Sequence, residues 1–135
     1  MSKKVQLKDS SGNIYPKTRD VYSTSEVKTD KIWIDGKHIY RKVFTYTNIG
    51  ISKDVTLQAT IANDINSISV IRFDFYFKLG GNDELRPFPT LASNGTALLQ
   101  ARWNNNKILF TGTDSWGAQT NRTLIAIIEY TKTTD

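Results

Sequence analysis

The chain has 135 residues, a formal charge of +5 and no cysteine, which predicts one domain with its own hydrophobic core and excludes a disulfide framework or a thiolate metal site. No apolar segment is long enough to span a bilayer and no apolar signal-peptide region follows the first residues, so we expect no membrane insertion. Lysine and arginine are scattered along the chain, with only short pairs such as Lys3-Lys4 and Arg41-Lys42. This distribution argues against a nucleic-acid partner. An anionic wall polymer such as teichoic acid stays an open alternative.

Residues 1–20 are polar and rich in turn-forming residues, which predicts a short extended N-terminal arm ahead of a domain that spans residues 21–135. At the start of that domain, Ser23 and Glu26 have the spacing of a capping box. No apolar periodicity follows them. The segment is therefore expected to form one helical turn at most, or a polar loop.

The sharpest local signal is an Asp-Gly pair between two runs rich in β-branched and aromatic residues. The runs are Lys31–Ile34 and Lys37–Phe44, and only Asp35 and Gly36 separate them. A two-residue hairpin loop prefers a type I′ turn, which needs positive φ at both central positions, and Asp and Gly accept that conformation. The pattern predicts a hairpin with a type I′ turn at Asp35-Gly36.

Two further strands are predicted in the middle of the chain. A break at Asn48–Gly50 precedes an alternating run at Val55–Ile61, and a turn follows at Asn63–Asn66. The next strand alternates most clearly, which indicates one face against a core and one toward water. Its apolar face is expected to hold Ile71, Phe73, Phe75, Phe77 and Leu79.

The last third of the chain predicts a second hairpin and a final strand. Arg86–Pro89 is expected to be an extended connection, because proline cannot donate to a central ladder. The runs Ala97–Trp103 and Lys107–Thr111, joined by Asn104–Asn106, predict a hairpin, and Thr123–Tyr130 predicts the last strand. With no helical stripe of useful length, the chain is predicted to be all-β, as a single antiparallel, jelly-roll-like β-sandwich.

The sequence offers little for catalysis. His38 is the one histidine and has no partner at a metal-ligand spacing, so we expect no metal site and no cofactor, and no nucleotide-binding or nucleophile motif is present. Asp83, Glu84 and Asp114 fall in predicted loops, where a carboxylate pair of the glycosidase kind is an alternative to ordinary turn residues. We expect a protein without enzymatic activity, with a small glycan-cleaving domain as the alternative.

Two tryptophans are the candidate ligand-binding residues. Trp103 borders the Asn-rich turn, and Trp116 lies in a predicted loop with Asp114 and Gln119, followed by Asn121. A loop tryptophan stacks on a sugar ring while neighbouring polar side chains bind its hydroxyls. The alternative is that each tryptophan packs against the sandwich or a neighbouring subunit.

Segments at both ends of the chain resemble a module of bacteriophage structural proteins. They are Val5–Pro16, Tyr22–Glu26, Trp33–Lys37 with Ile39–Lys42, and Ile128–Asp135. Such modules occur in phage tail-fibre, baseplate, receptor-binding and head-fibre proteins. The resemblance implies a virion protein assembled in the bacterial cytoplasm, with a structural or adhesive role and a homotrimeric state. The low apolar content and the position of the arm favour attachment to other virion proteins. In this setting, a host-surface glycan such as a cell-wall polysaccharide, or another virion subunit, is the expected ligand.

Overall fold

The computed structural model describes residues 7–8, 14–15, 21–51, 55–79, 84–88, 90–91, 97–112 and 119–135. Apart from one short 3-10 turn, η1, every element in these ranges is a β-strand, as the sequence predicts. In chain order the elements are β1 (Leu7–Lys8), β2 (Ile14–Tyr15), β3 (Val27–Ile32), β4 (His38–Ile51), β5 (Val55–Gln58), η1 (Ile65–Ser67), β6 (Ile68–Leu79), β7 (Glu84–Pro87), β8 (Thr90–Leu91), β9 (Ala97–Asn104), β10 (Lys107–Gly112) and β11 (Gln119–Lys132).

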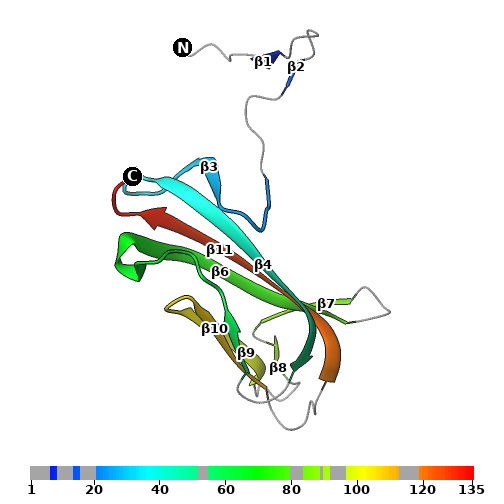
Figure 1. Cartoon of the computed structure of the whole chain (residues 1–135). Coiled ribbons are helices and arrows are strands. Elements are labelled where there is room, and N and C mark those ends of the chain that lie inside the picture. Colours follow the sequence, from blue (N-terminus) through cyan, green and yellow to red (C-terminus); the bar gives the residue numbers. More distant parts are fainter. Residues whose placement is uncertain are drawn as a thin grey trace.

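The strands form three sheets, two of which make the body of the domain. The five-stranded sheet has the order β3-β4-β11-β6-β7, the four-stranded sheet has the order β5-β10-β9-β8, and β1 pairs with β2. All pairings are antiparallel. Figure 1 shows β4, β11 and β6 as long strands side by side, with β9 and β10 in a second layer. The prediction of an antiparallel β-sandwich is confirmed.

The hydrophobic core lies between the four-stranded and five-stranded sheets. β11, the central strand of the larger sheet, contributes every second residue to it, as expected of a strand with one face covered. The buried members of the core are Tyr40, Leu57, Ala59, Phe75, Phe77, Ile108, Phe110, Leu124, Ala126, Ile128 and Tyr130.

The predicted apolar face of β6 is confirmed at Phe75 and Phe77, which are buried in the core. It is wrong at Ile71, because a bulge shifts the register there. Glu129 of β11 pairs with Arg72 and the next residue, Tyr130, pairs with Val70, so Ile71 is the extra residue. Val70 takes the place on the core side that the alternation had given to Ile71.

The first hairpin is present, but its turn differs from the prediction. The Gly36 amide donates to the Trp33 carbonyl at 2.9 Å and the Trp33 amide to the Lys37 carbonyl at 2.8 Å, which closes a loop of three residues. Only Gly36, with φ 86°, has a positive φ, whereas Asp35 does not. A three-residue loop that ends in a left-handed glycine is the next commonest hairpin after the two-residue form. Ile34, which the sequence places at the end of the first strand, therefore lies in the loop and is 90% exposed.

The second hairpin has the two-residue turn that the sequence suggested for the first. Asn104 pairs with Lys107, and both Asn105 (φ 49°) and Asn106 (φ 63°) have positive φ. Asparagine tolerates this conformation better than most residues because its short side chain bonds locally. The predicted hairpin is confirmed.

Two predicted interruptions are wrong. β4 continues through Asn48–Gly50 to Ile51, and the break appears only as a shift in its register with β11. Arg86 and Pro87, which the sequence places in an extended connection over Arg86–Pro89, belong to the strand β7 (Glu84–Pro87). β7 lies at the edge of the five-stranded sheet, where Pro87 needs no second ladder partner.

Candidate ligand-binding site

A concavity of about 430 Å³ lies along β5, β10 and β9 of the four-stranded sheet. Residues from both faces of the sheet line it: Val55, Ala101 and Phe110 on the core side, and Thr56, Gln100, Arg102 and Leu109 on the other side. The register places Thr56 opposite Leu109 and Leu109 opposite Arg102, so the three side chains share one face. The following residue of β10, Phe110, is buried in the core. Because successive residues of a strand point to opposite faces, the row Thr56–Leu109–Arg102 faces away from the core.

This row combines a charged, a polar and an apolar group within one concavity. Arg102 and Thr56 are exposed, Leu109 is half-buried between them, and the exposed Gln100 also lines the concavity. A guanidinium donates paired hydrogen bonds to a carboxylate or phosphate, and the hydroxyl and amide bind neutral hydroxyl groups. The arrangement fits a saccharide that carries a negative charge.

The residues predicted from the sequence to bind a ligand lie in several places. The Trp103 indole N–H donates to the Ala59 carbonyl at 3.1 Å, and the ring packs against the core, which favours the packing alternative for this residue. Asp114 and Trp116 lie outside the described residues. Gln119 and Asn121 lie in β11, and their side chains are outside the described part of the structure.

Sequence reasoning did not single out Arg102. The only signal for it is the alternation of β9, which places Trp103 and Ala101 on the core side and Arg102 on the other. An exposed arginine in a strand is ordinary taken alone. It becomes a candidate only when the register places Leu109 and Thr56 beside it.

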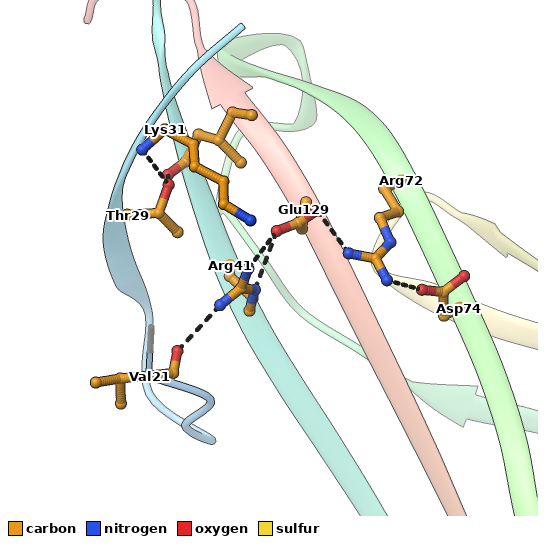
Figure 2. Close-up of polar contacts among 8 residues, drawn as sticks. Val21, Thr29, Lys31, Arg41, Arg72, Asp74 and Glu129 are labelled. Atoms are coloured by element: carbon orange, nitrogen blue, oxygen red, sulfur yellow. Dashed lines mark hydrogen bonds and ion pairs between the residues drawn. The ribbon is translucent and has the colours of Figure 1, made fainter. Parts of the chain in front are cut away.

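A row of charged side chains crosses the five-stranded sheet on the face opposite the core (Figure 2). Arg41, Glu129 and Arg72 are paired in the register of β4, β11 and β6. Glu129 Oε2 accepts from Arg41 Nε at 3.0 Å and Nη2 at 2.8 Å, while its Oε1 accepts from Arg72 Nη1 at 3.1 Å. Arg72 also contacts Asp74 at 2.6 Å. Both oxygens of Glu129 are thus held by guanidinium groups.

The Arg41 side chain is fully buried although it lies on the outer face, because the segment before β3 covers it. Tyr22 places its ring centroid 4.1 Å from the guanidinium carbon, and the Val21 carbonyl accepts from Nη1 at 3.3 Å. At the other end of the row, the hydrogen bond that Arg72 donates to Glu129, together with the nearby Asp74, raises the pKa of Arg72. Through Val21 and Tyr22, the row holds the segment before β3 against the outer face of the five-stranded sheet.

The surroundings of His38 are also structural. Its backbone N–H donates to Asp135 Oδ2 at 2.9 Å, its Nδ1 lies 3.2 Å from the same oxygen, and Tyr40 Oη donates to Oδ1 at 3.1 Å. The backbone hydrogen bond above all, with Tyr40 and the Lys28 ammonium, holds the pKa of Asp135 below its ordinary value. Among the described residues, no group of three or more His, Cys, Asp or Glu side chains could hold a metal ion.

No family model, curated protein or solved structure matches this chain. Within the described ranges, no helix is long and apolar enough to cross a membrane. Among the described residues, the concavity around Arg102 is the candidate ligand-binding site.

Proposed function

We propose that this chain is a bacteriophage virion protein with a structural or adhesive role, which binds a host-surface glycan or another virion subunit and has no enzymatic activity. The resemblance of its two end segments to phage fibre and baseplate modules supports the virion setting. The sandwich supports a binding role, since it presents a broad strand surface. The protein is assembled in the bacterial cytoplasm and carried on the particle.

The concavity around Arg102 is the observation that carries the glycan-binding proposal. Wall polymers of Gram-positive bacteria present repeated phosphate or carboxylate groups beside hydroxyls. The exposed guanidinium of Arg102 suits the charged group, and Thr56 and Gln100 suit the hydroxyls. Binding that combines these contacts is sensitive to ionic strength, because Arg102 is solvent-exposed.

A pull-down with purified full-length protein tests this proposal. We expect retention on an immobilised poly(glycerol phosphate) wall polymer without release of reducing ends, and at least a tenfold loss of retention in Arg102→Ala, as roughly expected for one charge-assisted contact. Lys107→Ala is the matched control, because it removes an exposed positive charge from the same strand pair outside the concavity. Equal loss in both variants would show only general charge attraction.

The same incubation separates binding from cleavage. Sustained sugar release that disappears on replacement of Asp83, Glu84 or Asp114 would establish the glycan-cleaving alternative instead. Asp83 and Asp114 lie outside the described residues, and the Glu84 side chain is not described. Binding with no release of reducing ends supports the adhesive role.

The homotrimer and the arm are parts of the same proposal. Light scattering is expected to give three times the chain mass of 15.3 kDa, and a monomer would contradict it. Deletion of residues 1–20 is expected to abolish incorporation into particles while circular dichroism still shows a folded β-domain. Unchanged incorporation would rule out the arm as the attachment segment.

A further inference from the structure

A second cavity, of about 490 Å³, lies at the end of the sandwich near Ser67 and is separate from the concavity around Arg102. It is lined from three directions. Glu26 precedes β3, Lys42 belongs to β4, and Lys132 belongs to β11. The segment between β5 and β6 closes the remaining side with Thr60, Asn63 and Ser67 among its polar groups.

Lys42 stands on the core side of the five-stranded sheet, where an apolar residue is expected. It pairs with Ile128, which is fully buried in the core, and paired residues share a face. Its ammonium donates to the Thr60 carbonyl at 3.1 Å and lies 5.1 Å from the Phe44 ring centroid. The sheet therefore directs a positive charge into the cavity.

Lys132 supplies a second positive charge from the neighbouring strand. Its ammonium donates to Glu26 Oε1 at 2.6 Å and lies 4.2 Å from the Tyr40 ring centroid. The hydroxyl of Tyr130 donates to Glu26 Oε2, so both oxygens of this carboxylate are in use. Glu26 thus holds Lys132 in place while cancelling one of the two lysine charges.

The charged groups that line the cavity sum to one net positive charge, from two lysines and one glutamate. Each ammonium has three donors, and the described contacts use one hydrogen bond of each. The Thr60 hydroxyl accepts from the Gln58 amide at 2.6 Å and keeps its own proton to donate. The two ammonium groups and the Thr60 hydroxyl therefore keep donors that a ligand can use.

We propose that this cavity binds an oxyanion, the phosphate or carboxylate group of a small molecule or of a saccharide unit. Lys42 and Lys132 would contact the charged oxygens, and the Thr60 hydroxyl would donate to a third. Phosphate and carboxylate share this chemistry, so the ligands used in the test distinguish them. This cavity shares no lining residue with the glycan site on the four-stranded sheet, so binding at one does not require the other.

Titration of the full-length protein with inorganic phosphate, glycerol phosphate and glucuronate, followed by amide chemical shifts, tests the proposal. We expect saturable shifts at Thr60, Ser67 and Ile68, with the stronger ligand class identified by its Kd. Lys42→Met is expected to weaken binding about tenfold, as for one charge-assisted hydrogen bond. Lys31→Met, which removes an exposed positive charge from β3 outside the cavity, is the control and is expected to leave the Kd unchanged.

Glu26→Gln gives the decisive comparison, because a binding role and a merely structural role predict opposite results. Without the carboxylate, Lys132 is released to the ligand and the net charge of the cavity rises, so the affinity for phosphate is expected to increase severalfold. Weaker binding in Glu26→Gln, or equal weakening in Lys31→Met and Lys42→Met, would overturn the proposal. Chemical-shift changes at these amides report binding in this cavity alone. The loss of polymer retention in Arg102→Ala reports binding at the other site, so either proposal can fail without the other.

Discussion

Arg41 and Glu129 form a two-point ion pair on the face of the five-stranded sheet that points away from the core, and both side chains are nonetheless buried, at 0% and 8% exposure. Removing two charges from water is costly, and that cost is offset here by the hydrogen bonds that both oxygens of Glu129 accept. The two residues are 88 positions apart in the sequence and join β4 to β11. The outer face of the sheet therefore has a polar, internally satisfied centre beneath the segment that contains Tyr22.

Replacing Glu129 by Gln is expected to destabilise the domain by about 3 kcal/mol, because the buried Arg41 guanidinium loses its counter-charge. Urea unfolding followed by tryptophan fluorescence measures this free energy. Asp74→Asn is the control at the exposed end of the same row, where both partners are nearly half exposed, and less than about 1 kcal/mol is expected there. Equal effects of the two substitutions would mean that burial does not set the strength of the pair.

The Asn105-Asn106 turn allows a second comparison between neighbours. Asn106 Nδ2 donates to the Ala62 carbonyl at 2.7 Å, and its Oδ1 accepts from the Ile61 amide at 2.9 Å. Asn106→Gly keeps the positive φ but removes both hydrogen bonds, so we expect a loss of about 2 kcal/mol in the free energy of unfolding. Asn105→Gly also keeps the positive φ and is expected to change it by less than about 0.5 kcal/mol. Similar losses in both variants would place the stabilisation in the turn itself.

The alternation of apolar residues was enough to predict the class of fold and most strands, because one face of each long strand is covered by the opposite sheet. The face of the sheet on which Ile71 lies was not predictable from the local pattern. The bulge at Ile71 depends on pairing with Glu129 and Tyr130, which are far away in the sequence. The turn at Gly36 differs from its prediction for a similar reason. An Asp-Gly pair suits both two-residue and three-residue loops, and the pairing of the flanking strands selects one.

The candidate sites were harder to predict than the fold. Arg41-Lys42 looks like a solvated pair in the sequence, yet Arg41 is buried on one face of the sheet and Lys42 lines a cavity on the other. Their opposite directions follow from strand alternation. The burial of Arg41 and the cavity beside Lys42 depend on the distant segments that contain Tyr22 and Thr60, and no local pattern indicates those contacts.

Trp103→Phe separates a packing role from a ligand-binding role. The substitution keeps an aromatic ring but removes the indole N–H that donates to the buried Ala59. We expect a loss of about 1 to 2 kcal/mol in the free energy of unfolding, from an unpaired carbonyl and a smaller ring. Retention on the wall polymer is expected to stay the same. Unchanged stability with weaker retention would instead make Trp103 a ligand-binding residue.

Acid is expected to destabilise the domain by protonating two carboxylates, those of Glu26 and Asp135. Glu26 accepts hydrogen bonds from Tyr130 and Lys132, and Asp135 accepts one from the His38 backbone. Burial alone would raise the pKa of Glu26, but the hydrogen bonds from Lys132 and Tyr130 outweigh it and lower the pKa below the ordinary 4.5. The pKa of Asp135 is lowered below 3.8, mainly by the His38 backbone N–H. In each case the unfolded chain binds its proton at a higher pH than the folded chain does. The stability that these groups contribute is therefore complete above about pH 5 and is lost as the pH falls through 4.5 and below.

Urea unfolding at a series of pH values between 6 and 3 measures this effect. The wild-type free energy of unfolding is expected to fall steadily with acid, and the double variant Glu26→Gln with Asp135→Asn is expected to start lower and to fall less. Asp30→Asn is the control, because its carboxylate makes no hydrogen bond or ion pair with the residues that the structure describes, and it should keep the wild-type slope. A double variant with the wild-type slope would show that other carboxylates cause the loss of stability in acid.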